Sequence, residues 1–226
     1  MESLAWLQQR ILDAAQHQIP LRLRGSGSKD FYGEAARGEA LDVSVHQGIV
    51  SYEPTELVIT AKAGTALSLI EQSLAEHRQM LAFEPPHFGP QATVGGMVAA
   101  GLSGPRRATS GAVRDFVLGM SLIDTNAEVL RFGGEVMKNV AGYDLCKLLV
   151  GSRGTLAVVT QVTLKLRPLP ETSAQLWLTF DAFRTIEDRL AGLLREQGYT
   201  AQEIDAVLSL NPQRLGDVRR RLDAVR

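Results

Sequence analysis

The first residues of the chain place apolar side chains at helical spacing. Leu4, Leu7 and Ile11 recur every three or four residues with polar residues between them, so they share one face of a helix. After Pro20 the segment 21–24 alternates as LRLR, a pattern typical of a short strand, and stops at a glycine-rich loop. The pattern therefore predicts a helix followed by a strand and a turn.

Strand-type and helix-type patterns alternate between residues 41 and 80. Two β-rich stretches, 41–45 and 57–61, are predicted to be strands separated by turn residues. Helical spacing returns over 65–80, with Thr65 as the expected N-cap. This order predicts a small α/β unit. The apolar face of the predicted helix holds Leu67, Ile70 and Leu74, with Leu81 after them.

Glycine and proline are frequent over 83–119, so most of this segment is predicted to be irregular. Within it, VGGMVAAGL at 94–102 has the small residues expected where a helix starts and packs very close to a neighbour. Three regular elements are predicted afterwards: a hairpin over 120–133 with its turn at 124–126, a helix that ends at Gly151, and an alternating strand over 155–168.

The pattern becomes helical toward the end of the chain. The prolines of LRPLPETS at 166–173 mark a connection, and AQLWLTF at 174–180 could begin a strand. Thr200–Glu203 has the spacing of a capping box, and Asn-Pro at 211–212 suits the start of a further helix. Three amphipathic helices are therefore predicted. The first, FRTIEDRLAGLLREQ at 183–197, precedes the capping box and has Phe183, Ile186, Leu190 and Leu193 on one face; the helix after Asn-Pro has Leu215, Val218, Leu222 and Val225 on one face.

The composition is that of an ordinary globular protein. The chain has 226 residues, 45% of them hydrophobic, with 24 basic and 25 acidic side chains, a balance that argues against nucleic-acid binding and disorder. The single cysteine, Cys146, is expected to be buried; it excludes an internal disulfide and a cysteine-rich metal site. Without a secretory pattern, or an apolar run near the roughly 18 residues of a membrane span, a cytoplasmic location is expected.

Three glycine-rich loops, at 25–27, 95–104 and 151–154, each adjoin a predicted strand or helix. Glycine lets a ligand approach the backbone, and successive exposed N–H groups can hold an anion. Together the loops suggest a large ligand with a diphosphate, although each one alone is also what a tight turn requires. The first loop, GSGSKD, lacks the third glycine of a dinucleotide fold, which disfavours a standard Rossmann fold, and the absence of a P-loop motif excludes a P-loop protein.

The order of four segments resembles one superfamily of flavoproteins. They read RGSGSK, PPHFGPQATVGGMVAAGLSGPRR, SGAVRDFVLG and FGGEVMKNVAGYDLCKLLVGSRGTLAVVTQVTLKL. The resemblance is to the vanillyl-alcohol oxidase / p-cresol methylhydroxylase (PCMH) type, and within it to the FAD-binding subunits of bacterial glycolate oxidases. It implies an α+β fold, in which residues 1–170 form a two-lobed PCMH-type FAD-binding domain with FAD extended between the lobes. Residues 171–226 would be a short, mostly helical tail that stands where a cap domain is truncated or replaced.

The resemblance also implies which positions hold FAD. The first loop would offer backbone N–H groups to the pyrophosphate, with added attraction from Arg24 or Lys29. A second stretch would line the diphosphate and flavin, a third would sit near the cofactor, and a fourth would approach the adenine and flavin edges. In that order the positions are Arg24, Gly25, Ser26, Gly27, Ser28 and Lys29; Thr93, Val94, Gly95 and Gly96; Ser110, Gly111, Arg114 and Asp115; and Gly154, Thr155, Leu156 and Val159.

Several members of the superfamily tether the flavin through a histidine after the first glycines. The corresponding positions here are 26–29, which read SGSK, so the resemblance implies non-covalent FAD. His87 could contact the flavin, though a loop histidine is more often exposed or hydrogen-bonded. Arg106 and Arg107 could attract an acidic substrate or partner, or form an exposed charge pair. No residue matches a catalytic base, so the catalytic residues are unknown.

Three functions remain open at this point. The resemblance implies an oxidoreductase whose FAD accepts a hydride equivalent from a 2-hydroxy acid such as glycolate. The alternative is a non-catalytic FAD-binding subunit that assembles with a catalytic flavin subunit and an iron–sulfur subunit, with any association with the inner membrane made through these partners. An incomplete or chimeric chain without activity is the third, because the tail from EDRLAGLLREQ onward weakly resembles a helical segment of the β subunit of glycyl-tRNA synthetase.

Overall fold

The computed structural model describes residues 2–34, 37–134, 144–171 and 180–208. The chain divides into two compact units, Met1–Pro170 and Glu171–Arg226, and each is described by itself. The first unit contains an N-terminal lobe and a larger sheet lobe.

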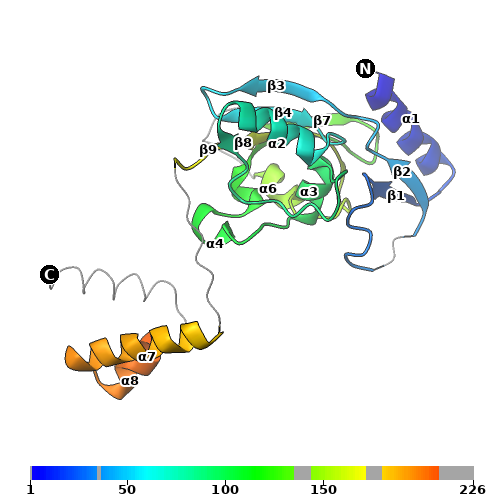
Figure 1. The fold of residues 1–226 in the computed structure, drawn as a ribbon. Helices are drawn as coiled ribbons and strands as arrows, with labels where there is room; N and C mark the ends of the chain where they lie inside the picture. Colours follow the sequence, from blue (N-terminus) through cyan, green and yellow to red (C-terminus); the bar gives the residue numbers. More distant parts are fainter. Residues whose placement is uncertain (1, 35–36, 135–143, 172–179, 209–226) are drawn as a thin grey trace. The chain divides into compact units, whose positions relative to one another are not determined.

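The N-terminal lobe consists of α1 (Glu2–Gln16), β1 (Leu21–Arg24) and β2 (Glu39–Asp42), as Figure 1 shows. The predicted helix and first strand are confirmed, and the predicted strand at 41–45 starts two residues earlier and ends at Asp42. β1 and β2 pair in parallel. The lobe has its own small core, which also includes residues at the ends of two strands of the sheet lobe. This core contains Leu7, Ile11, Leu41, Ile123, Ala127 and Val158.

The sheet lobe is built on a five-stranded antiparallel sheet of order β3-β4-β8-β6-β7. The predicted hairpin is confirmed: β6 and β7 pair, and Asp124 in their turn accepts N–H bonds from Asn126 and Glu128 at 2.9 and 2.8 Å. β3 was not predicted, because it is a largely solvated edge strand without a clear apolar alternation. The strands are β3 (Ile49–Glu53), β4 (Val58–Lys62), β6 (Val117–Ile123), β7 (Val129–Gly133) and β8 (Val158–Lys165).

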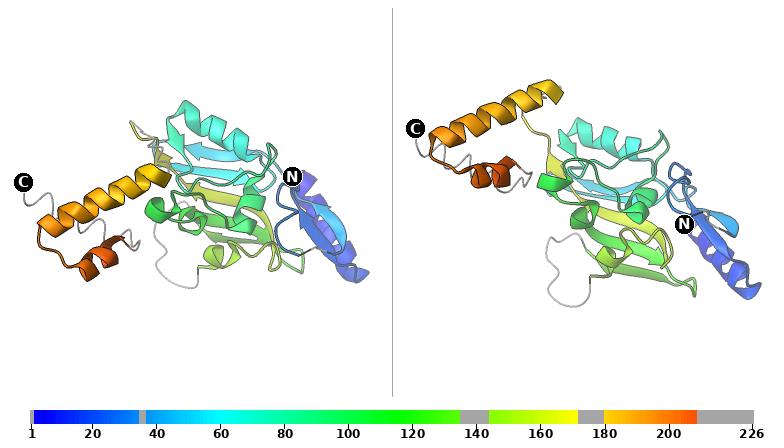
Figure 2. Two further views of the ribbon diagram at one scale, coloured as in Figure 1. Left: turned by 60° about the horizontal axis from the view of Figure 1, so that its bottom comes forward. Right: turned by 90° about the horizontal axis from the view of Figure 1, so that it is seen from below.

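Two helices, α2 (Leu67–Glu76) and α3 (Val94–Ala100), lie beside the sheet in the ribbon views of Figure 2. Their buried residues belong to one hydrophobic core with those of the sheet. The predicted apolar face of α2 is confirmed, since Leu67, Ile70 and Leu74 are fully buried. The expected N-cap role of Thr65 is wrong: Ala66 is the N-cap and makes no side-chain cap bond. The Thr65 hydroxyl instead accepts from the Gly48 N–H at 2.9 Å and donates to the Gly48 carbonyl at 3.1 Å, so it secures the entry into β3.

Short elements complete the first unit. β5 (Gln79–Met80) pairs with β9 (Arg167–Pro168), so the predicted strand at 155–168 is divided into β8 and β9. The predicted helix before Gly151 has α6 (Leu145–Leu149) as its described part, and residues 135–143 lie outside the description. Cys146 on α6 is buried, as expected. The connection between α3 and β6 holds two further short helices, α4 (Arg107–Ser110) and α5 (Val113–Phe116).

The second unit contains α7 (Phe180–Glu196) and α8 (Ala201–Leu208). The predicted capping box is confirmed, since the Thr200 N–H donates to Glu203 Oε2 at 2.9 Å and the Glu203 N–H donates to Thr200 Oγ1 at 3.4 Å. The strand expected at 174–180 falls outside the described residues except for Phe180, which begins α7, and the helix expected from 211 lies outside them entirely. Among the helices that are described, none is both long and apolar enough to span a membrane.

Candidate functional site

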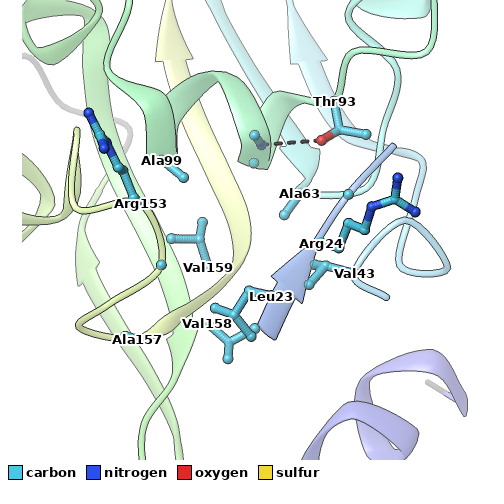
Figure 3. Close-up of a pocket in the computed structure, with 14 residues that line it drawn as sticks. Leu23, Arg24, Val43, Ala63, Thr93, Ala99, Arg153, Ala157, Val158 and Val159 are labelled. Atoms are coloured by element: carbon cyan, nitrogen blue, oxygen red, sulfur yellow. Dashed lines mark hydrogen bonds between the residues drawn. The ribbon is translucent and has the colours of Figure 1, made fainter. Parts of the chain in front are cut away.

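A cleft runs between the loop that follows β1 and the helix α3. Its outer part has a volume of about 490 Å³ and continues into an inner part of about 90 Å³. Figure 3 shows the inner part, where side chains from β1, α3 and β8 converge. The two parts form one cleft because they share lining residues. These are Leu23, Arg24, Gly25, Thr93, Gly96, Ala99 and Arg153.

Most of the residues predicted to hold FAD line this cleft. Arg24 at the end of β1 and all five residues of the loop 25–29 do so, together with Thr93 at the N-cap of α3, two glycines of α3, and residues before and within β8. The structure thus brings three segments distant in the sequence to one place. The predicted residues that line the cleft are Arg24, Gly25, Ser26, Gly27, Ser28, Lys29, Thr93, Gly95, Gly96, Gly154, Thr155 and Val159.

The other predicted positions lie elsewhere in the described structure. Val94 is fully buried in the sheet-lobe core, and Leu156 is exposed without lining the cleft. Ser110, Gly111, Arg114 and Asp115 belong to the α4–α5 region, where Asp115 accepts the Ala112 N–H at 2.8 Å and closes the first turn of α5. A role for these residues at the cofactor stays a prediction.

His87 and Arg106 have partners within the protein. His87 Nε2 lies 3.1 Å from Glu71 Oε1 on α2. Arg106 donates to both carboxylate oxygens of Glu84, through its backbone N–H and through Nε, each at 2.9 Å. Neither residue lines the cleft, as far as the described residues define it.

Gly95 brings α3 against the sheet. Its N–H donates to the Ala63 carbonyl at 2.7 Å, and a Cβ on Gly95 would lie 2.7 Å from the Cβ of Ala63. Real Cβ atoms do not approach so closely, so only glycine allows this packing. The close packing predicted for this segment is therefore confirmed.

The first N–H groups of α3 are all used within the protein. Val94 donates to the Thr65 carbonyl at 2.9 Å, Gly95 donates to Ala63, and Gly96 donates to Thr93 Oγ1 at 3.2 Å, the dashed bond in Figure 3. An anion in the cleft therefore finds no free donor at this helix end. The glycines of α3 give close approach, and the anion must be held elsewhere.

The backbone N–H groups of the loop 25–29 differ from those of α3, because they are not used within the described structure. Within the described structure its five backbone N–H groups make no hydrogen bond, while its carbonyls accept at Gly27 from Asp30 at 3.0 Å and at Lys29 from Tyr32 at 2.9 Å. Gly27 has a φ of 77°, a left-handed conformation that suits glycine. Consecutive N–H groups without internal partners are what an anion-binding nest offers.

Positive charge dominates the outer part of the cleft. Arg24 is paired with Asp30 at 2.7 Å, and this hydrogen bond and charge raise the pKa of Arg24. Arg153 lies over the ring of Tyr32, with its Cζ 4.2 Å from the ring centroid. Lys29 differs, because its Nζ is buried and has no hydrogen-bond partner among the described residues, and burial lowers its pKa. The charged lining residues are Arg22, Arg24, Lys29, Asp30, Glu34 and Arg153.

These features fit a cofactor that carries a diphosphate next to an aromatic ring. Backbone N–H groups that have no partner among the described residues suit the phosphate oxygens. The inner part of the cleft is lined mainly by apolar side chains, which suits an uncharged ring system. Its apolar residues are Leu23, Val43, Ala63, Ala99, Ala157, Val158 and Val159.

Arg153 and Tyr32 were missed by the sequence analysis. Arg153 lines both parts of the cleft and has a positive φ of 55°, which is uncommon for a residue with a side chain. A signal was present, because Arg153 stands between the glycines of the segment GSRGTL. Its stacking on Tyr32 depends on how the loops meet, which no local pattern reveals.

Comparison with known proteins finds a matching family model and several relatives. A family model described as FAD binding domain matches residues 1–133. Glycolate oxidase subunit GlcE of Escherichia coli (strain K12) is 55% identical over 170 residues, which is 75% of this chain and 49% of that protein. A D-lactate dehydrogenase of Archaeoglobus fulgidus is 34% identical over 183 residues, which is 78% of this chain and 39% of that protein.

A third relative, glycolate oxidase subunit GlcD of Bacillus subtilis (strain 168), is 31% identical over 182 residues, or 78% of this chain and 39% of that protein. The chain thus spans about half or less of the length of these relatives. Among solved structures, an alkyldihydroxyacetonephosphate synthase superposes with a TM-score of 0.59 at 18% identity, over 74% of this chain and 30% of that one. This likeness concerns the fold alone.

The comparisons confirm the predicted fold class and the resemblance to glycolate oxidase subunits. The weak likeness of the tail to a tRNA synthetase segment stays a prediction. On a family match over residues 1–133 and a relative with 55% identity, the chain belongs to the FAD-binding domain family of flavoproteins, and its cofactor is FAD.

Proposed function

We propose that the chain is the FAD-holding part of an oxidoreductase that takes a hydride equivalent from a 2-hydroxy acid such as glycolate. The relatives are named as glycolate oxidase subunits and D-lactate dehydrogenases, which share this substrate class. Bound FAD supplies the redox chemistry, and the protein supplies binding and orientation. The observation that carries the proposal is the loop 25–29, which lines the cleft and whose backbone N–H groups have no hydrogen-bond partner among the described residues.

The residues of the cleft divide the task of binding between them. The N–H groups of the loop 25–29 receive the diphosphate oxygens, and the apolar side chains of the inner part exclude water from an aromatic ring. Gly96 keeps side-chain bulk out of the cleft, and Gly95 lets α3 pack against the sheet beside it. Positions 26–29 read SGSK where several members of the superfamily carry a histidine, which supports FAD held without a covalent bond.

One observation favours a second candidate, a non-catalytic FAD-binding subunit. The carboxylates in the described lining are Asp30 and Glu34, and Asp30 is already engaged by Arg24, so a proton acceptor for a 2-hydroxy acid is not evident there. Such a subunit would assemble in the cytoplasm with a catalytic flavin subunit and an iron–sulfur subunit. Onward electron transfer needs such a partner, because one cysteine cannot ligate a cluster.

Absorbance spectroscopy of the purified protein tests the proposal and separates the two candidates. We expect a flavin spectrum, with free FAD released by acid. Anaerobic addition of glycolate or lactate should bleach the flavin if the chain is catalytic, whereas bound flavin that is not bleached by either acid supports the assembly subunit. A folded protein that neither contains nor takes up FAD would contradict both candidates and leave a chain without activity.

A pair of glycine variants tests the loop itself. Gly27→Val places a branched side chain in the nest and should abolish retention of FAD. Gly48→Val is the matched control, because Gly48 also has a positive φ, 125°, but lies outside the cleft with nothing within 4 Å of the added Cβ. Both variants place a β-branched residue at a positive φ, which costs about 1–3 kcal/mol in each. Equal FAD affinity in the two would show that the loop is an ordinary turn.

A further inference from the structure

The segment 28–33, which follows β1 and its glycines, meets the sheet lobe through aromatic rings. Phe31 packs edge-on against Phe88, with 5.1 Å between the ring centroids. The guanidinium of Arg153 lies over the ring of Tyr32, with its Cζ 4.2 Å from the ring centroid. Among the described residues, no hydrogen bond joins this segment to the sheet lobe, so it is these ring contacts that hold it there.

Tyr32 and Arg153 belong to opposite walls of the cleft. Both line its outer part, Tyr32 from the segment after β1 and Arg153 from the loop before β8. Arg153 also lines the inner part, where Figure 3 shows it across the cleft from β1. The contact between the two residues therefore bridges the cleft. A ligand that reaches from the outer part into the inner part has to pass between the walls that this contact joins.

The two residues of the sheet lobe that meet the segment 28–33 share an uncommon backbone conformation. Phe88 and Arg153 have φ values of 53° and 55°, in the left-handed region that bulky residues rarely adopt. Such residues cluster at ligand clamps and switch regions, and they persist where the surrounding structure fixes them. For Arg153 the fixing contact is to α3, because its N–H donates to the carbonyl of Ala99 at 2.9 Å.

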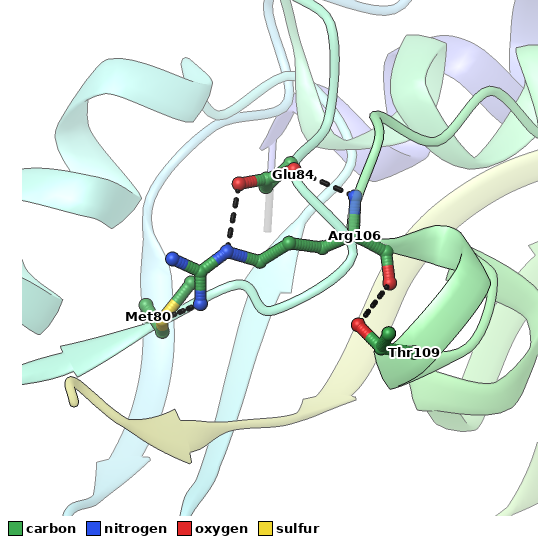
Figure 4. Close-up of polar contacts among 4 residues, drawn as sticks. All are labelled: Met80, Glu84, Arg106 and Thr109. Atoms are coloured by element: carbon green, nitrogen blue, oxygen red, sulfur yellow. Dashed lines mark hydrogen bonds and ion pairs between the residues drawn. The ribbon is translucent and has the colours of Figure 1, made fainter. Parts of the chain in front are cut away.

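The loop that carries Phe88 is also anchored, at its start. Arg106 donates to both carboxylate oxygens of Glu84, as Figure 4 shows, through its backbone N–H and through Nε. The ring of Phe88 is thus positioned from within the sheet lobe, whereas Phe31 is 66% exposed. When the ring contacts break, the part that moves is therefore the segment 28–33.

We propose that residues 28–33 form a strap that closes the cleft over FAD and opens to let the cofactor enter and leave. Each ring contact favours the closed strap by a factor of only about 2 to 10, so the strap opens while both lobes stay folded. Both contacts join protein groups to one another, so weakening either one should speed entry and exit alike. The inference rests on the proposed function in placing FAD in this cleft.

The rates of FAD binding to the apoprotein and release from it, followed by flavin fluorescence, test the strap. Phe31→Ala removes a ring that does not line the cleft, and it should raise both rates by about 2- to 10-fold with the Kd unchanged. A residue that binds the ligand would instead change mainly the dissociation rate. Tyr32→Ala should also raise both rates, whereas Tyr32→Phe keeps the ring below Arg153 and should match the original chain within about twofold.

Trp6→Ala is the matched control for Phe31→Ala. Trp6 is likewise an exposed ring of the N-terminal lobe, on α1, and it does not line the cleft. Its removal should change both FAD rates by less than about twofold. Equal acceleration by Trp6→Ala and Phe31→Ala would mean that the loss of any surface ring loosens the lobe, and it would contradict the strap.

Trypsin cleavage after Lys29, identified by fragment mass, measures opening of the strap without FAD. The protease takes the lysine side chain into its specificity pocket, but in the closed strap the Lys29 Nζ is buried. Cleavage therefore reports the open population when opening is fast. Arg153→Met leaves the sequence of the strap unaltered and should speed cleavage by about 2- to 5-fold. Arg131→Met, on β7 and outside the cleft, should change it by less than about twofold.

Two results would overturn the inference. Phe31→Ala could alter the Kd and leave the association rate as it is, which would make Phe31 a binding residue. Alternatively, Tyr32→Ala could leave both FAD rates unchanged while Arg153→Met leaves the cleavage after Lys29 unchanged. If the original chain takes up no FAD, the proposed function fails, and the cleavage experiment still decides whether residues 28–33 open as a strap.

Discussion

Gly25 and Thr93 meet across the cleft with no room for a side chain at residue 25. A Cβ on Gly25 would lie 2.6 Å from Thr93 Oγ1 and 3.4 Å from its Cγ2. The same Oγ1 accepts the Gly96 N–H at 3.2 Å and so caps α3. The contact therefore connects the loop after β1 with the start of α3, and it sets how closely the two walls of the cleft approach.

Gly25→Ala should widen the cleft at this point. The new methyl group has to displace the Thr93 hydroxyl from the Gly96 N–H, and this loss of the N-cap costs about 0.5–2 kcal/mol of stability. The displacement also moves the loop after β1 away from the start of α3, so the groups that line the cleft lie further apart. We expect a lower melting temperature and weaker FAD binding. Thermal unfolding and flavin fluorescence titration measure the two effects.

The control is a double-mutant cycle with Thr93→Ala. That substitution removes the Oγ1 and Cγ2 atoms that the methyl group would meet, so adding Gly25→Ala to it should cost less than adding Gly25→Ala to the original chain. Strictly additive losses would mean that the two residues do not limit one another.

His46 should make the protein sensitive to mild acid. It is buried, its Nδ1 lies 2.8 Å from the Ser3 hydroxyl on α1, and burial, followed by the charge of Lys62, lowers its pKa. The unfolded chain then binds a proton near the ordinary value of 6.5 while the folded chain resists it. The free energy of unfolding should therefore fall as the pH drops below about 6.5 and level off below the folded pKa.

Denaturant titrations at a series of pH values measure this dependence. His46→Gln keeps a polar group that can reach Ser3 but does not titrate, so its stability should fall less between pH 7 and pH 5 than that of the original chain. Parallel curves for the two proteins would assign the acid sensitivity to other groups.

Cys146 should make the folded protein less stable as the pH rises into the alkaline range. Burial, and next the charge of Asp144, raise the pKa of its thiol above the ordinary value of 9.0, so the folded chain keeps the proton that the unfolded chain loses. Stability should fall as the pH rises past that value, and Cys146→Ala should remove this part of the slope. At neutral pH the thiol should react with a thiol reagent only when the protein opens, so labelling faster than unfolding would contradict the burial.

Elements whose structure is carried by a local pattern could be predicted from the amino-acid sequence. Apolar spacing was enough for α1 and for the buried face of α2, and turn residues were enough for the hairpin β6–β7. Two features were not predicted correctly: β3, an edge strand whose partly solvated residues lack alternation, and the role of Thr65, whose hydroxyl bonds to Gly48. That bond depends on a residue 17 positions away, so spacing within the helix could not reveal it.

The candidate site shows the same limit. Glycine content located the loops that line the cleft, because tight packing and positive φ both require glycine. The division of roles between the loops was not visible, since it depends on whether an N–H group has a partner. Gly95 donates to Ala63, whereas the N–H groups of the loop 25–29 have no partner in the described part of the chain. The contact between Lys29 Nζ and the ring of Phe88, 5.8 Å from its centroid, likewise joins residues that are distant in the sequence.

The left-handed backbone of Glu84 should reverse the usual order of stability, in which an alanine variant is more stable than a glycine variant. Its φ of 49° lies in the left-handed region, where an added Cβ is unfavourable. Glu84→Ala and Glu84→Gly both lose the two bonds to Arg106, but only alanine keeps the strain. Glu84→Gly should therefore be more stable than Glu84→Ala by about 1 kcal/mol in denaturant unfolding.

Gln72 provides the matched control for that comparison, because it is exposed in the middle of α2. At a helical position glycine is less stable than alanine by about 1 kcal/mol, so Gln72→Gly should be the weaker of its pair. The opposite signs at the two positions would show that backbone conformation at Glu84, and not a general intolerance of alanine, sets the order. If alanine is the more stable residue at both positions, the loop that carries Phe88 is not strained at Glu84, and the contacts with Arg106 stabilise a relaxed turn.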